Sequence, residues 1–237
     1  MTCSSLIFMN TKLNFRIAWF CALLIGYWVL LILFPAHDLG STDIFSREGN
    51  LASHIDRLLM PGRLYLGNHD PEGLLSTIPA IGTALLGMFT GEFLLSKYLS
   101  DKPLRKVLYM VLVAIVLMII GKIWNIVFPI NKNLWTSSFV LHVGGWSLLL
   151  LSLFYYVIDV KGYRKWAFFF TIIGMNSILI YMSGRFINWG YTTKATLGWL
   201  GQLAGDPWNA VVMAICYVMV KWCFLYFMYR QKIFLRV

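Results

Sequence analysis

Charged residues are scarce in this chain of 237 residues, at 13% of the sequence, and acidic residues are half as numerous as basic ones. Soluble globular domains carry about 25% charged and about 45–50% apolar residues. Because 59% of this sequence is hydrophobic, its composition excludes a soluble globular domain. Twelve of the twenty basic residues fall in short clusters between long apolar runs, so the net charge of +10 indicates membrane topology and not nucleic-acid binding.

Cysteines are also few, and the sequence holds four: Cys3, Cys21, Cys216 and Cys223. They lie near the N-terminus or within apolar runs, and their spacing fits no paired Cys-x-x-Cys template. The sequence therefore predicts neither a disulfide framework nor a metal site. It also lacks a phosphate-binding loop, a Ser-His-Asp arrangement and a haem-binding pair of residues.

Long apolar runs, by contrast, are plentiful. A membrane-spanning helix needs about 20 apolar residues, and six segments qualify or nearly do. They are residues 15–34, 78–95, 107–127, 134–157, 166–182 and 208–229. The sequence predicts an all-α, polytopic membrane helix bundle of about six transmembrane helices, a single membrane domain over residues 1–237 with an outer loop at 35–77.

The orientation in the lipid bilayer follows from the short basic segments. Lysines and arginines cluster at the N-terminus, in the loops 96–106 and 158–165, and at the C-terminus. These four segments alternate correctly with six helices, and basic residues are retained on the cytoplasmic side. Both termini are therefore predicted to be cytoplasmic. The opposite loops hold most of the acidic residues.

The outer loop contains one helical pattern. Apolar residues recur with helical spacing over residues 51–59, on the face opposite Asp56 and Arg57. Asn50 precedes the pattern as an N-cap candidate, and Pro61 and Gly62 follow it as a stop. We expect a short amphipathic helix on the outer surface.

A polar run follows, from His69 to Pro79. Asp70 suits an N-cap, Pro71 the first helical position, and Glu72 the first turn, where the helix dipole favours a carboxylate. The alternative is that His69, Asp70 and Glu72 rim an outward-facing site and accept hydrogen bonds from a polar substrate.

The segment 128–136 is predicted to be a tight outer turn between two spans. Asn131 and Asn133 suit a turn because their side chains mimic backbone hydrogen bonds, and Lys132 can lie in water. Together with the indole of Trp135, the same residues could hold a sugar or a phosphate. Both interpretations remain open.

Two polar residues fall within predicted spans. Asn176 lies near the middle of the fifth, where it either makes an interhelical hydrogen bond or lines a cavity. Lys221 lies in the sixth, and its side chain is expected to lean toward the N-terminus, away from the nearer cytoplasmic face. Lys221 is a candidate for binding an anion that enters from the cytoplasm.

Several of these segments occur together in one protein family. They are IDRLL at 55–59, DPEGLLSTI at 70–78, PINKNLW at 129–135, DVKG at 159–162, GMNSIL at 174–179 and KIF at 232–234. In this order they resemble the heparan-alpha-glucosaminide N-acetyltransferase family and its bacterial relatives. The resemblance implies a transmembrane acyltransferase in the bacterial cytoplasmic (inner) membrane, without a metal. It would transfer acetyl from cytoplasmic acetyl-CoA, its co-substrate, to an amino sugar on the outer side.

The family also carries an N-terminal block of helices with a histidine taken to be catalytic, and this block does not occur upstream of Phe15. We therefore expect an incomplete copy, with a companion N-terminal half or a second copy as partner. Catalytic residues stay unknown. Candidates for the substrate or acyl-CoA cavity are Asp70, Glu72, Asn131, Lys132, Asn133, Trp135, Asn176 and Lys221. The alternative is a non-catalytic membrane transporter, or a ligand-binding or structural subunit.

Overall fold

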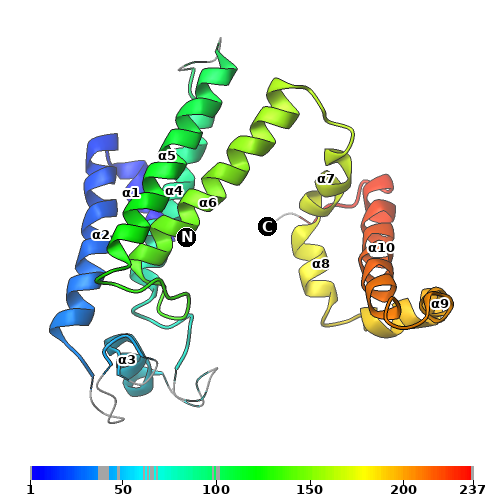
Figure 1. Ribbon diagram of the computed structural model, residues 1–237, viewed down its shortest axis with the longest axis horizontal. Coiled ribbons are helices and arrows are strands. Elements are labelled where there is room, and N and C mark those ends of the chain that lie inside the picture. Colours follow the sequence, from blue (N-terminus) through cyan, green and yellow to red (C-terminus); the bar gives the residue numbers. More distant parts are fainter. Residues whose placement is uncertain are drawn as a thin grey trace. The chain divides into compact units, whose positions relative to one another are not determined.

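The computed structural model of the protein describes residues 2–36, 43–46, 49–60, 62, 64, 67, 69–97, 99 and 102–235. Within these residues the protein is all-helical and contains no β-strand (Figure 1). The predicted all-α class is confirmed. The chain divides into two compact units, residues 1–156 and residues 157–237.

The first unit contains six α-helices among its described residues. They are α1 (Thr2–Asn10), α2 (Leu13–Leu33), α3 (Leu51–Leu59), α4 (Thr77–Leu95), α5 (Pro103–Trp124) and α6 (Ser137–Tyr155). Pro103 occupies the first turn of α5, where a missing N–H costs no helical hydrogen bond. A π-helical turn, Tyr156–Val160, extends α6.

The second unit contains four α-helices among its described residues. They are α7 (Ala167–Met175), α8 (Ser177–Ser183), α9 (Trp189–Ala204) and α10 (Asn209–Arg230). Asn188 caps the start of α9, since its side chain accepts a hydrogen bond from the N–H of Tyr191 at 3.0 Å. The helix α9 packs against α10.

Five helices are long and apolar enough to cross a membrane: α2, α4, α5, α6 with its π-helical extension, and α10. They correspond to five of the six predicted segments and support an integral membrane protein. The remaining segment, 166–182, is not one continuous helix. Its halves α7 and α8 meet at Asn176, whose φ of −132° and ψ of 35° lie outside the helical range.

The helices α5 and α6 touch backbone to backbone. A Cβ atom on Gly121 would lie 2.8 Å from the backbone nitrogen of His142, and one on Gly145 would lie 2.7 Å from the carbonyl oxygen of Ala114. Glycines at such crossings let membrane helices approach closely. The short connection between α5 and α6 is thereby fixed at its base.

The helix α3 forms where the sequence predicts it, but its buried face is polar. Asn50 caps it by accepting a hydrogen bond from the N–H of Ser53 at 2.8 Å, as predicted. Ser53 and Asp56 are fully buried, while Leu58 and Leu59 are 69% and 67% exposed. Hydrogen bonds from the polar face to neighbouring loops decide the orientation.

Candidate functional site

A histidine joins the two polar segments that the sequence singles out. His69 is buried, its Nδ1 lies 2.6 Å from Oγ of Ser53, and its Nε2 lies 3.2 Å from the carbonyl oxygen of Asn133. A carbonyl can only accept, so Nε2 carries the hydrogen and Nδ1 accepts the serine proton. His69 thus connects α3, residues 69–76 and the turn 129–136, and we call the surface formed by these three segments the polar mouth.

The turn 129–136 is held by its own hydrogen bonds. The Asn131 side chain accepts from the N–H of Asn133 at 2.9 Å, the backbone mimicry that the sequence predicts. The hydroxyl of Thr136 accepts from the N–H of Asn131 at 3.0 Å and donates to the carbonyl of Pro129 at 2.9 Å. Lys132, at the tip, is exposed.

Two hydrogen bonds attach this turn to helix α2. The buried hydroxyl of Tyr27 donates to the carbonyl oxygen of Leu134 at 2.6 Å. The hydroxyl of Ser137 donates to the carbonyl oxygen of Leu24 at 2.7 Å. Both bonds join residues more than 100 positions apart in the sequence, so they fix the polar mouth onto the helix bundle.

Trp135 has a left-handed backbone conformation, with φ of 51°. Bulky residues seldom adopt this region, and the strain persists only where neighbouring contacts enforce it. Here the indole Nε1 donates to the hydroxyl of Thr83 on α4 at 3.1 Å. Trp135 therefore points from the turn toward α4, half-buried, at one side of the polar mouth.

Asp70 is not the N-cap of α4, and that prediction is wrong, because the helix begins at Thr77 with Ser76 before it. In a helix that starts after Asp70, the N–H of Leu74 would bond to the Asp70 carbonyl. Leu74 instead donates to the carboxylate of Asp56 at 2.9 Å. The Asp70 side chain closes a turn by accepting from the N–H of Glu72, also at 2.9 Å, and Glu72 itself is exposed.

Asp56 is the residue of the polar mouth that sequence reasoning missed. Its Oδ1 holds Leu74, and its buried Oδ2 bonds to none of the described residues. Burial raises the pKa of this carboxyl, as does the nearby charge of Asp70, while the bond from Leu74 and the charge of Arg57 act in the opposite direction.

A glycine makes room for this carboxyl. A Cβ atom on Gly73 would lie 1.9 Å from Oδ2 of Asp56. The glycine of the DPEGLLSTI segment is therefore required by close packing against α3. No periodic pattern in the sequence marks the contact between this glycine and the aspartate of IDRLL.

Comparisons with known proteins identify relatives of the chain. No family model matches the chain. Human heparan-alpha-glucosaminide N-acetyltransferase is 29% identical over 207 residues, which cover 80% of this chain and 30% of the relative. The mouse protein of the same name is 35% identical over 154 residues, which cover 56% of this chain and 23% of the relative. The predicted family resemblance is confirmed.

The chain spans less than a third of the length of these two curated N-acetyltransferases, consistent with a C-terminal portion of the family. The similarity and the five apolar helices together support a membrane protein that resembles an acyltransferase.

The second unit contains the two other candidate residues. Asn176 is buried, its Nδ2 donates to the carbonyl of Ile233 at 3.0 Å, and its Oδ1 accepts from the N–H of Leu235 at 3.1 Å. The GMNSIL and KIF segments of the N-acetyltransferase resemblance are thus in contact. The Lys221 ammonium lies 4.2 Å from the centroid of the Tyr217 ring, one turn toward the N-terminus, in the direction that the sequence predicts.

Proposed function

We propose that this chain forms the acceptor mouth of a membrane acetyltransferase that uses acetyl-CoA as donor and an amino sugar as acceptor. The observation that carries the proposal is the His69 bridge, which brings together the segments 70–78 and 129–135 of the family resemblance. The similarity to heparan-alpha-glucosaminide N-acetyltransferases supports an acetyl donor and a sugar acceptor.

The polar mouth offers groups that suit an amino sugar. Exposed Glu72 and half-buried Asp70 supply carboxylate oxygens for hydroxyl or ammonium donors, and exposed Lys132 supplies a donor for ring and hydroxyl oxygens. Asn133 and Trp135 lie on the same turn. The predicted topology places this mouth on the outer side of a bacterial cytoplasmic membrane and the basic loops on the side of acetyl-CoA.

The transfer needs a base for the acceptor amine. The amine nitrogen attacks the thioester carbon, a C–N bond forms, and the C–S bond breaks. The amine gives up its proton to the base, which passes it to the sulfur so that CoA leaves as the thiol. Both ring nitrogens of His69 are engaged, so we assign it a positioning role. In this proposal the base comes from a segment outside these 237 residues, a companion half of the enzyme.

A binding experiment tests the acceptor mouth. Saturation-transfer NMR of the detergent-solubilised chain with glucosamine should detect binding that the double variant Glu72→Gln, Lys132→Gln weakens by about three- to tenfold, as expected for lost hydrogen bonds to charged groups at an exposed site. The matched control is Glu92→Gln, which removes an exposed carboxylate of the opposite end of α4. Unchanged binding by the double variant would refute the acceptor mouth.

A second experiment tests the origin of the base. The purified chain, mixed with acetyl-CoA and glucosamine, should yield no acetylated sugar above the uncatalysed background. Robust turnover by the chain alone would overturn the assignment of the base to another segment, while leaving the acceptor mouth to be judged by the binding experiment.

A further inference from the structure

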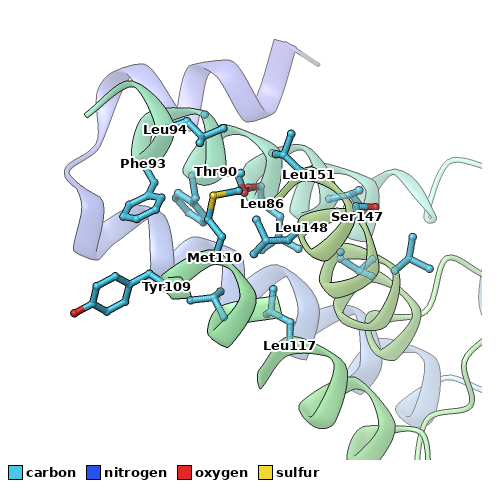
Figure 2. A pocket seen from close by; sticks show the side chains of 18 of the residues that line it. Leu86, Thr90, Phe93, Leu94, Tyr109, Met110, Leu117, Ser147, Leu148 and Leu151 are labelled. Atoms are coloured by element: carbon cyan, nitrogen blue, oxygen red, sulfur yellow. The ribbon is translucent and has the colours of Figure 1, made fainter. Parts of the chain in front are cut away.

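A cavity of about 640 Å³ lies within the first unit, among α4, α5 and α6. Figure 2 shows side chains of all three helices around it, with Phe93 from α4, Met110 from α5 and Leu148 from α6. Met110 and Leu148 are buried and form its floor, while Val113 and Val143 are exposed at its rim. The cavity is therefore a groove that opens between helices of membrane-spanning length.

The groove offers little to a polar ligand. The hydroxyl of Thr90 donates to the carbonyl of Leu86 in its own helix, and that of Thr83 is bonded to the indole of Trp135. The other lining residues are apolar apart from Ser147 and Tyr109, and Figure 2 shows the Tyr109 hydroxyl directed away from the groove. A sugar or a nucleotide would lose its hydrogen bonds to water here, whereas a hydrocarbon chain would lose none.

The length of the groove corresponds to one leaflet of a bilayer. Along α4 its lining runs from Thr83 to Leu94, a rise of about 16 Å at about 1.5 Å per residue. Half of the hydrocarbon core of a bilayer is about 15 Å. Gly87 and Gly91 widen this stretch, because a Cβ atom on either glycine would meet nothing within 4 Å.

Positive charge gathers where the groove ends, at the junction of α4 and α5. Lys106 is buried there and donates to the carbonyls of Leu94 and Ser96 at 2.8 and 3.1 Å, which neutralises the negative end of α4. Arg105 and Lys102 are exposed beside it, and Arg105 lies one helical turn before the groove residue Tyr109. The side chains of Arg105 and Lys102 can therefore bind an anionic group at the membrane surface.

We infer that the groove binds one acyl chain of an anionic phospholipid, with the phosphate of the headgroup at Arg105 and Lys102. The lipid belongs to the leaflet that adjoins the α4–α5 junction. Its chain runs along α4 toward Trp135, so it ends beside the turn of the polar mouth. This site is independent of the proposed acetyl transfer.

Photo-crosslinking of the full-length polypeptide in mixed micelles tests whether the groove binds an acyl chain. Phosphatidylglycerol with a diazirine in one acyl chain should label groove residues such as Phe93, Met110 and Leu148, as mapped by mass spectrometry. The groove-filling variant Gly87→Leu, Gly91→Leu should reduce this labelling about tenfold, the order of the penalty for overpacking an apolar site. The control Gly26→Leu adds the same side chain on α2, where a Cβ also meets nothing within 4 Å. Its groove should be labelled to the same extent as that of the wild type.

Two results would refute acyl-chain binding in the groove. One is undiminished labelling in the groove-filling variant, with its fold verified by an unchanged unfolding temperature. The other is absence of groove labelling in the wild type, which is also the result expected if a protein segment covers the groove.

The headgroup is tested by competition. Phosphatidylglycerol should label the groove more than phosphatidylcholine with the same chains, and Lys102→Gln and Arg105→Gln should each reduce this preference about fivefold. Lys122→Gln, at the opposite end of α5, should leave it unchanged. Equal labelling by the two lipids would overturn the anionic headgroup.

Discussion

Replacement of Asp56 should loosen the polar mouth by an amount that depends on the new side chain. Asp56→Ala removes the acceptor for the N–H of Leu74, a bond of 2.9 Å to a buried carboxylate. Hydrogen bonds to charged groups contribute about 1.5–3 kcal/mol, so amide exchange at Leu74 should accelerate by about one to two orders of magnitude. Asp56→Asn retains an acceptor oxygen and should protect Leu74 far better than the alanine variant does.

The same residue gives the polar mouth a pH dependence. Because burial raises the pKa of the Asp56 carboxyl, the folded protein holds this proton more tightly than the unfolded chain does. Between the unfolded and folded pKa values, the unfolded chain has already lost its proton while the folded protein still holds it. The contribution of Asp56 to the free energy of unfolding is therefore fully present at low pH, and it falls as the pH rises through that window. Asp56→Asn should abolish this contribution.

Hydrogen–deuterium exchange of a peptide covering residues 69–76 measures both effects. Rates are corrected for intrinsic exchange over a pH series that begins at about pH 4, near the ordinary pKa of an aspartate, and runs upward. Asp159→Ala is the control, since it removes an exposed carboxylate that lies 3.8 Å from the guanidinium of Arg164. Equal exchange in the alanine and asparagine variants would refute the role of the carboxylate, and a pH dependence that survives in Asp56→Asn would refute its titration.

Three further outcomes follow from contacts in the two units. Gly73→Ala should destabilise the polar mouth by about 1–3 kcal/mol in exchange experiments and do so much less in an Asp56→Ala background; purely additive effects would contradict the contact. Tyr27→Phe should lower the stability by about 1 kcal/mol in thermal unfolding, and a value within error of wild type would argue against the bond to the turn. Asn176→Ala should speed tryptic cleavage after Lys232 by about tenfold, because two hydrogen bonds to the C-terminal segment are lost; unaltered cleavage would disprove that restraint.

The sequence alone predicts the membrane helices well, because about 20 consecutive apolar residues leave a chain few alternatives to a spanning helix. Its prediction of α3 is confirmed in position and in the Asn50 cap, but it does not say which face of the helix is buried. The periodicity of Leu58 and Leu59 marks an apolar face without saying what covers it. The bonds of Ser53 and Asp56 to residues 69–74 decide which face is buried, and such long-range pairs leave no periodic pattern.

The candidate site likewise combines local features that the sequence predicts with long-range contacts that it does not. The turn chemistry of Asn131 depends on neighbours within two residues and is therefore readable from the sequence. The bond between His69 and Asn133 joins positions 64 apart, and composition gives no sign of it. Asn176 was recognised as polar within a span, but its partners lie in the C-terminal segment, beyond the last helix.

The close contact of α5 and α6 at Gly121 and Gly145 bears on the proposed binding of an acceptor at the polar mouth. Two helices in backbone contact are restrained from sliding or rotating past one another, and this restrains the turn that joins them. Little conformational freedom is then left to lose on binding. Under the proposed function, the polar mouth would present a fixed shape to an acceptor and would exclude acceptors that do not fit it.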